Sequence, residues 1–362
     1  MTPSPRVALV GCGWAGGRHA AAFVQYGARI LWAVDVNRAK AEALARACSA
    51  DHVSTDYRQA LQDAEVQAVS ICLPHALHAQ VAVEAAEAGK HILCEKPIAA
   101  TLAEADQMTA SAERAGVVLM IAENVRYEPL YQKVRELLQD GAIGQPALIQ
   151  MTRECYLVQS FLEERPWFLD RQMAAGGIMM SGGIHDFETM RLLLGEIESV
   201  SALRAPQRFP RMQGDDTSVA LVRFTSGTVG TLVESFIMKS LTTATGPEVH
   251  TLRIDGELGS LAVRGGRTIE LFSEREDYCL GGELVQHDIH VPPVDTFALE
   301  VAHFIECVHT GQEPLTSGRS QRRALEAVLA AYRSMELGGE VVKLSDLNTS
   351  PHTRTPTRPT QG

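Results

Sequence analysis

The sequence predicts an α/β protein, in which an N-terminal doubly wound parallel sheet is followed by an α+β domain with a large, mostly antiparallel open sheet. Short β-branched runs alternate with alanine-rich helical stretches up to about residue 123, and a glycine-rich turn follows the first run. Longer strand-like stretches replace this rhythm after about residue 125. These three observations together predict the two kinds of sheet.

The length of the chain also predicts two domains. At 362 residues and 45% hydrophobic composition, the chain is too long for one ordinary core. We expect domains at 1–124 and 125–347. Residues 348–362 are rich in threonine and proline and lack apolar side chains, so this tail is expected to be disordered.

The strands of the first sheet are expected in five apolar runs, at residues 6–11, 30–35, 68–74, 91–97 and 117–124. The helix after the fourth run begins with a capping box, because Thr101 is followed three residues later by Glu104. This signal places the helix start just beyond Pro97. Lys96 is therefore expected in a turn between a strand and a helix.

The second domain opens with a predicted helix through residues 127–141. Strand-like stretches follow, and breaks at Ser226-Gly227 and between Glu257 and Gly259 are hairpin signals. These patterns predict an antiparallel sheet built from residues 146–155, 218–238 and 251–265.

Two amphipathic helices, at 297–311 and 320–337, are expected to cover one face of this second sheet. The other face needs a different cover if it is apolar. We expect a second subunit there, in a homodimer or homotetramer formed through the C-terminal sheet.

Composition excludes several classes of partner. The net charge is −11 and no run of Lys or Arg occurs, so we expect no nucleic acid partner. No stretch reaches the roughly 18 apolar residues of a membrane helix, and the first ten residues lack a signal peptide's apolar segment. Seven cysteines are scattered without metal-ligand spacing, which predicts reduced thiols in a cytoplasmic protein and no metal site.

A GxGxxG motif lies between the first strand and the first helix. Gly11 permits the tight turn, Gly13 lets backbone N–H groups reach a pyrophosphate, and Gly16 allows close packing of helix on strand. Trp14 and Ala15 lie between these glycines, where the helix N-terminus faces the anion. The motif in this context predicts a dinucleotide cofactor.

Asp35 ends the second strand, nineteen residues past Gly16. A carboxylate there can accept hydrogen bonds from both hydroxyls of the adenosine ribose and would repel a 2′-phosphate. We therefore expect NAD as the cofactor. Arg38 lies close enough to weaken this preference, so NADP stays possible.

Four segments together resemble the Gfo/Idh/MocA family of glucose-fructose oxidoreductases and inositol dehydrogenases, over almost the whole chain. They are GCGWAG at 11–16, the stretch 73–97 that ends in CEKP, AENVRYEP at 122–129, and the glycine-rich stretch 167–195. The resemblance implies a Rossmann domain and then an α/β domain whose open sheet often builds dimers or tetramers. It also implies oxidation or reduction of sugars, polyols or related compounds.

Lys96 is the first candidate catalytic residue. It follows a strand at the carboxyl end of the parallel sheet, where ligands bind in such folds. Its ammonium can hold a substrate hydroxyl, stabilise the alkoxide that grows as hydride leaves, and relay the proton. Glu95 could orient it.

His185 is the second candidate, because an imidazole can accept a hydroxyl proton near neutral pH. The resemblance implies that a His here follows an Asp by four residues and acts with the Lys on the sugar hydroxyl. In this sequence that Asp is Ser181. We expect His185 to be less basic and to be oriented by another group, and a structural, helix-capping His185 is the alternative.

The resemblance also suggests supporting residues, each with a structural alternative such as a helix start or core packing. Leu73, Pro74 and His75 correspond to the turn beside the nicotinamide ribose, with His78 near it. Asn124, Arg126 and Tyr127 resemble the family's cofactor and substrate wall, and Trp167 could stack on a sugar or on the nicotinamide.

Three functions are compatible with these residues. The favoured hypothesis is an NAD(P)-dependent dehydrogenase acting on a secondary hydroxyl or carbonyl of a sugar, polyol or glycoside. A second is an enzyme that oxidises a sugar transiently with tightly bound NAD in order to cleave a glycosidic bond. A third, a non-catalytic sensor of the dinucleotide, would need neither Lys96 nor His185.

Overall fold

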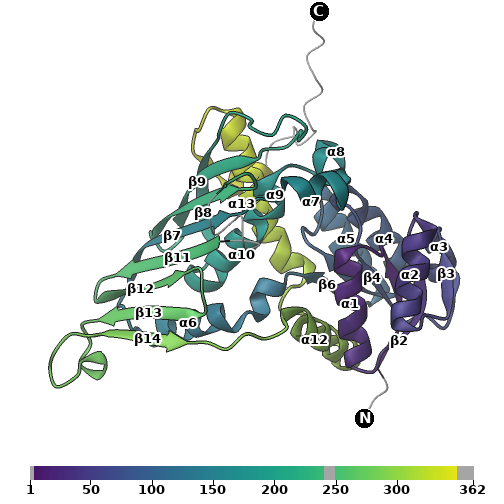
Figure 1. The fold of residues 1–362 in the computed structure, drawn as a ribbon, viewed down its shortest axis with the longest axis horizontal. Coiled ribbons are helices and arrows are strands. Elements are labelled where there is room, and N and C mark those ends of the chain that lie inside the picture. Colours follow the sequence, from purple (N-terminus) through teal and green to yellow (C-terminus); the bar gives the residue numbers. More distant parts are fainter. Residues whose placement is uncertain (1–3, 240–248, 349–362) are drawn as a thin grey trace, which may run out of the picture.

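The computed structural model describes residues 4–239 and 249–348, which form two sheets with helices between and around them (Figure 1). All strand pairs in the first sheet are parallel. The strand order is that of a dinucleotide-binding fold, in which ligands bind outside the carboxyl ends of the strands. In order across the sheet, the strands are β3 (His52–Ser54), β2 (Arg29–Val34), β1 (Arg6–Val10), β4 (Ala68–Ile71), β5 (His91–Glu95) and β6 (Leu119–Ala122).

Helices connect these parallel strands, as the alternating pattern predicts. The predicted capping box is present, since Thr101 and Glu104 exchange side-chain to backbone hydrogen bonds at the helix start. Lys96 therefore follows β5 in the turn that leads to this helix. The connecting helices are α1 (Trp14–Gln25), α2 (Arg38–Cys48), α3 (Tyr57–Gln62), α4 (His78–Glu87) and α5 (Leu102–Ala115).

The second sheet has nine strands, and burial alternates along strands such as β9 and β13, which bury one face. The predicted hairpins are confirmed as β9 with β10 and β11 with β12. One neighbouring pair, β7 with β10, is parallel. In order, the strands are β14 (Gln286–His290), β13 (Thr268–Ser273), β12 (Gly259–Arg264), β11 (Val249–Gly256), β7 (Pro146–Glu154), β10 (Val229–Ser235), β9 (Thr217–Phe224), β8 (Ile197–Arg204) and β15 (Val342–Lys343).

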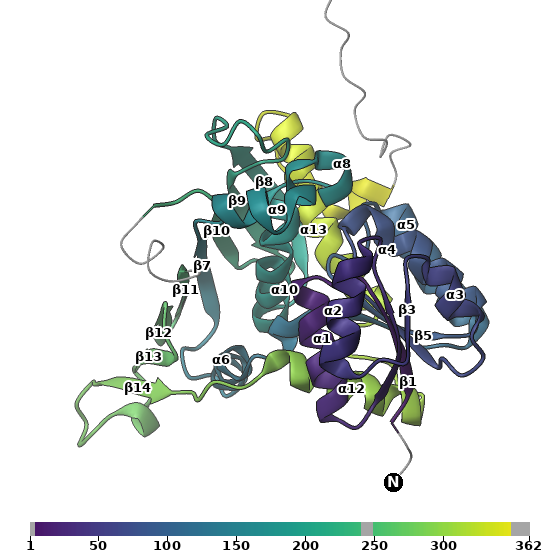
Figure 2. The same cartoon turned by 45° about the vertical axis from the view of Figure 1, so that its right-hand side comes forward.

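Helices cover the face of this sheet that is turned toward the first domain (Figure 2). The long helix α13 (Gly318–Glu336) packs on β8, as predicted, and also contacts α5 and α10. The remaining helices of this part are α6 (Pro129–Gln139), α7 (Val158–Glu163), α8 (Arg171–Ala174), α9 (Ile178–Ser181) and α10 (Gly183–Leu194).

The prediction for helix α12 (Thr296–Thr310) is wrong. This helix packs on α1 and not on the second sheet. Its residues Val301, Phe304 and Ile305 belong to the buried core of the first sheet, and the Phe304 ring meets Phe23 edge to face. The helical period reveals an apolar face but not which surface that face covers. The division of the chain at residue 124 stays a prediction, because a late segment completes the first core.

The other turns of helix are short and of the 3-10 type. They are η1 (His75–Leu77), η2 (Asn124–Tyr127), η3 (Pro166–Leu169), η4 (Glu276–Tyr278) and η5 (Leu344–Asn348). The predicted tail begins within η5, and its residues 349–362 lie outside the described part. Among the described residues, no helix is both long and apolar enough to span a bilayer. No disulfide joins any of the seven cysteines, all of which lie in the described part of the chain.

Candidate active site

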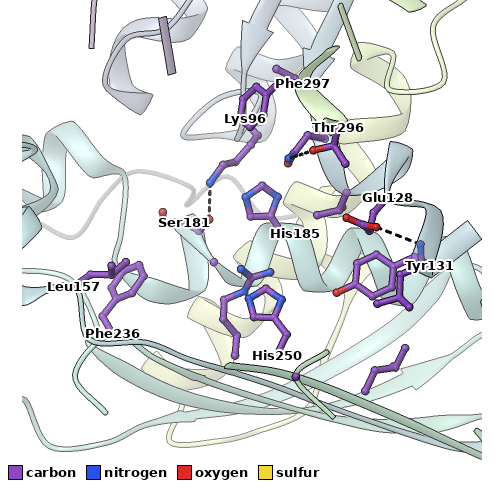
Figure 3. A pocket seen from close by; sticks show the side chains of 18 of the residues that line it. Lys96, Glu128, Tyr131, Leu157, Ser181, His185, Phe236, His250, Thr296 and Phe297 are labelled. Carbon is purple, nitrogen blue, oxygen red and sulfur yellow. Dashed lines mark hydrogen bonds between the residues drawn. The ribbon is translucent and has the colours of Figure 1, made fainter. Parts of the chain in front are cut away.

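A cavity of about 720 Å³ lies between the two sheets, at the carboxyl edge of the parallel one. The first domain contributes Trp14, Glu95, Lys96 and Asn124 to its wall. The second part of the chain contributes the floor, from α9, α10 and the inner face of the second sheet (Figure 3). These floor residues include Arg153, Ser181, His185 and His250.

The glycine turn has the shape that a dinucleotide requires. Gly11 has a φ of +98°, and an added Cβ would lie 2.1 Å from the carbonyl oxygen of Cys72. A Cβ on Gly16 would lie 2.1 Å from the carbonyl oxygen of Gly11. A Cβ on Gly13 would meet nothing within 4 Å, so the space beside it is open to a ligand. The turn fits a pyrophosphate at Gly13.

The start of α1 is suited to an anion. Within the described residues, no side chain caps this helix and its first turn holds no acidic residue. Its first N–H groups therefore face outward with the positive end of the helix dipole. Asp35 lies beside this turn, and its carboxylate accepts hydrogen bonds from the backbone N–H of Cys12 and of Asn37, both at 2.8 Å.

Among the described residues, no hydrogen bond joins Arg38 to Asp35. The Nε of Arg38 instead donates to Glu42 at 2.9 Å on the surface of α2. Removal of the Asp35 carboxylate should therefore lower discrimination against a 2′-phosphate. We expect Asp35→Ser to weaken NADH binding by about tenfold, roughly 1.4 kcal/mol, and to narrow the preference for NADH over NADPH. The measurement is the Kd of each reduced nucleotide by fluorescence.

The matched control for this variant is Asp51→Asn. Asp51 precedes β3, at the opposite edge of the sheet, and pairs with Arg29 on the surface. Loss of that exposed pair should leave both Kd values unchanged. An unchanged ratio of NADH to NADPH affinity in Asp35→Ser would contradict the assignment of Asp35 to the ribose.

Lys96 reaches across from the first domain to the second. Its Nζ donates a hydrogen bond of 2.7 Å to the backbone carbonyl of Ser181, at the end of α9. Figure 3 shows this ammonium and the ring of His185 facing the same part of the cavity. The structure therefore brings together the two residues that the sequence predicts as catalytic.

Glu123 is a site residue that sequence reasoning missed. It follows β6, is fully buried, and its Oε1 contacts Nδ1 of His185. Burial raises the pKa of Glu123 to about 8, although Lys96 opposes this shift. Its position at the end of the fifth apolar run, where a strand of the parallel sheet ends, could have marked it as a candidate site residue from the sequence. The partner, 62 residues away, could not be inferred from the sequence.

The expectation that His185 needs an orienting group other than residue 181 agrees with this contact. Ser181 lines the cavity, where its backbone carbonyl holds Lys96. The glycines around it are required by packing: a Cβ on Gly177 would lie 2.1 Å from the Asp215 carbonyl oxygen, and one on Gly182 would lie 2.7 Å from Glu234. This segment is therefore held closely in place.

Glu95 points toward α1. Its Oε1 lies 3.2 Å from Nε2 of the buried His19, and its Oε2 accepts a hydrogen bond from the backbone N–H of Lys96. Burial opposes ionisation of Glu95, but the hydrogen bond to His19 lowers its pKa below the ordinary value. Glu95 thus fixes the backbone of the turn that carries Lys96.

Arg153 and Asp186 form a second feature that the sequence did not reveal. Their paired hydrogen bonds measure 2.8 and 2.9 Å, and both side chains are buried. Burial opposes ionisation of Asp186, yet the charge of Arg153 holds its pKa well below the usual range. This ion pair supports the cavity floor directly beside His185.

Several predicted supporting residues lie behind the cavity wall. His75 donates from Nδ1 to the carbonyl of Ala174, and both ring nitrogens of His78 face the carbonyl oxygens of Pro97 and Leu73. Burial lowers the pKa of both imidazoles. These rings join backbone segments of the site. Contact of the Leu73–Pro74 turn with a cofactor stays a prediction.

Aromatic and basic candidates also make structural contacts. Trp167 stacks on Phe168 with ring centroids 4.0 Å apart, within a small aromatic cluster. Arg126 pairs with Glu188, and the Tyr127 ring packs near the core of the first domain. None of these three is among the lining residues of the cavity in the described part of the chain. In contrast, Asn124 lines it and donates to Thr296 at 2.9 Å.

Comparison with known proteins gives matches along most of the chain. Residues 5–123 match a family model described as "Oxidoreductase family, NAD-binding Rossmann fold", and residues 131–262 match the GFO/IDH/MocA C-terminal domain. The chain is similar to the uncharacterized oxidoreductase YrbE of Bacillus subtilis, at 28% identity over 84% of this chain and 86% of that protein. It is 27% identical to myo-inositol 2-dehydrogenase of Thermotoga maritima, over 91% and 96% of the two chains.

A solved structure of levoglucosan dehydrogenase in complex with NADH has the same fold, with a TM-score of 0.84 and 21% identity. The match covers 94% of this chain and 99% of that one. Both domains and their order along the chain thus agree with the matched models. The protein belongs to the GFO/IDH/MocA family of oxidoreductases, and its N-terminal half contains an NAD-binding Rossmann domain.

Proposed function

We propose that this protein is a dehydrogenase that uses NAD to transfer a hydride to or from a secondary hydroxyl or carbonyl carbon of a sugar or polyol. The observation that carries the proposal is the meeting of Lys96 and His185 in one cavity at the carboxyl edge of the cofactor-binding sheet. The similarity to a myo-inositol 2-dehydrogenase supports a polyhydroxylated substrate.

Different residues bind the pyrophosphate, the ribose and the nicotinamide of the cofactor. The open space at Gly13 and the start of α1 bind the pyrophosphate, and Asp35 binds the ribose. The nicotinamide ring, when bound, accepts or supplies the hydride. Asn124, which lines the cavity, is suited to bind the carboxamide or a substrate hydroxyl.

Lys96 and His185 act on the reacting hydroxyl. The Lys96 ammonium holds the oxygen and stabilises the negative charge that develops on it as hydride leaves the carbon. His185 presents Nε2 to the substrate, because Nδ1 is occupied by Glu123, and accepts the hydroxyl proton. In the reverse direction the same groups return the proton to the new hydroxyl.

The test is a screen of sugars, inositols and glycosides with NAD and with NADP, followed by the absorbance of reduced nicotinamide. The proposal requires at least one polyol or sugar to produce NADH in the wild type and not in Lys96→Ala. Cleavage of a glycoside without accumulation of NADH would favour the transient oxidation hypothesis instead. Silence with all substrates and both cofactors would contradict the dehydrogenase assignment.

The outer face of the second sheet supports a homo-oligomer, which we also propose. Leu203, Val219 and Leu221 are each 43% or more exposed on β8 and β9. Leu203 pairs with Val219 across the strands, and Val219 pairs with Val233, so the apolar row continues onto β10. Helices α10 and α13 cover only the opposite face (Figure 2). A second copy would bury this row.

We expect Leu221→Asp to shift the protein toward monomers, because an aspartate at the centre of an apolar interface would be desolvated without a partner. Sedimentation velocity measures the change in mass. Glu198→Gln, an exposed change on the neighbouring strand β8, is the control and should leave the mass unchanged. A wild-type protein that sediments as a monomer would refute the oligomer. The cytoplasmic location stays a prediction.

A further inference from the structure

The contact between Glu123 and His185 joins the two halves of the site. Glu123 follows β6 of the parallel sheet, whereas His185 lies in the first turn of α10. The carboxylate is 0% exposed and the imidazole 14% exposed, so only the ring can reach a ligand. A buried carboxylate therefore stands directly behind a partly exposed imidazole.

The carboxylate of Glu123 is poorly compensated. Within the described residues its second oxygen, Oε2, is buried without a hydrogen bond. A buried carboxylate oxygen without a hydrogen bond has lost its hydration without compensation, so such groups are uncommon unless they serve a function. By contrast, the buried Asp186 has both oxygens bonded to Arg153. Glu123 differs from this structural ion pair because its contact is a group that can gain and lose a proton.

We propose that Glu123 is the positioning residue of His185, holding Nδ1–H so that Nε2 faces the substrate and stabilising the imidazolium that forms when Nε2 accepts the hydroxyl proton. This inference rests on the proposed dehydrogenase function. The proton balance is simple: the substrate O–H bond breaks, an Nε2–H bond forms, and the hydride leaves to the nicotinamide. In the reactive form Glu123 is ionised and bonded to Nδ1–H, and it keeps this bond as Nε2 takes up the proton.

Charges around the pair set its titration. Burial raises the pKa of Glu123 to about 8, although the positive charges of Lys96 and Arg153 oppose this shift, so ionisation of the carboxylate behind the ring depends on the groups around it. A negative charge beside an imidazole raises its basicity, so removal of that charge lowers the pKa of His185. The other groups that act on the pair are Lys96, Glu95, Arg153, Glu188, Glu300 and His75.

The test is Glu123→Gln, which keeps the size of the side chain and removes its charge. We expect kcat for alcohol oxidation to fall at least about 100-fold, with KM and the NADH Kd within about twofold of the wild type. The acid limb of the kcat/KM profile should move down by about one pH unit or more. Glu113→Gln, which changes an exposed carboxylate on α5, is the control and should change none of these values.

The outcomes separate this inference from the proposed function. An unmoved acid limb, even with lower activity, would mean that Glu123 is only structural. If Glu123→Gln is fully active and Lys96→Ala is inactive, the inference about Glu123 is overturned and the proposed dehydrogenase function stands. If both variants are active, the proposed dehydrogenase mechanism is overturned. If Glu123→Gln does not bind NADH, Glu123→Asp replaces it. That variant retains the charge, so it should lower kcat less and keep the acid limb near the wild-type position; an acid limb displaced as far as the inference expects for Glu123→Gln, although the charge is kept, would refute the role.

Discussion

Turnover of the Lys96→Ala variant is expected to fall by about 10³-fold or more, while its NADH Kd changes by no more than about twofold. In the proposed mechanism the ammonium of Lys96 acts on the substrate oxygen, so its loss would remove charge stabilisation that is realised mainly in the transition state. Steady-state kinetics gives kcat, and fluorescence titration with NADH gives the Kd.

A control separates loss of this amine from loss of any lysine. Lys133→Ala removes an exposed lysine on α6 that pairs with Glu136, and it should retain wild-type kcat. Lys96→Arg keeps the charge but with a planar, larger head, and we expect it to remain far below the wild type. A Lys96→Ala protein with weak NADH binding and normal turnover of the bound complex would assign the residue to cofactor binding instead.

The second large effect is expected on cofactor binding from Gly13→Val. The backbone at Gly13 is extended and its Cβ would meet no atom within 4 Å, so the folded chain can accept a side chain there. The valine would then occupy the space that the pyrophosphate needs. We expect the NADH Kd to rise at least about 100-fold, roughly 2.7 kcal/mol, with a change in Tm of only a few degrees.

Neighbouring glycines provide contrasting controls. A Cβ on Gly17 also meets nothing within 4 Å, but this residue lies inside α1, so Gly17→Ala should keep NADH affinity and add helix stability. Gly11→Ala should lower Tm strongly, because its φ is +98° and the new Cβ would overlap the carbonyl of Cys72. Tight NADH binding by Gly13→Val would contradict a pyrophosphate at this turn.

Much of the first domain could be predicted because its signals are local. The five apolar runs became strands β1, β2, β4, β5 and β6, and the capping box at Thr101 set the start of α5 within the expected turn. The short strand β3 was not predicted, since three residues carry too little periodicity. In the second domain the hairpin breaks gave the pairing of β9 with β10 and of β11 with β12.

The remaining features depend on contacts between distant segments. The strand pattern could not show that β7 and β10 run parallel, because alternation of side chains is the same for either direction. The contact of Glu123 with His185 joins the two domains, and the ion pair of Arg153 with Asp186 joins segments of the second domain that are 33 residues apart. The sequence motifs indicated Lys96 and His185 individually, whereas the carboxylate that holds the imidazole became visible only when β6 and α10 were placed together.

The position of α12 has a consequence for how the chain is made. Ribosomal synthesis releases the parallel sheet early, but the Val301 and Phe304 side chains that cover its core belong to residues near position 300. Until that segment emerges from the ribosome, Phe23 and the apolar residues around it stay exposed to water on the nascent first domain. Truncated chains that end before residue 296 would keep this surface exposed and would therefore be prone to aggregate, whereas a separately supplied α12 peptide could mask it.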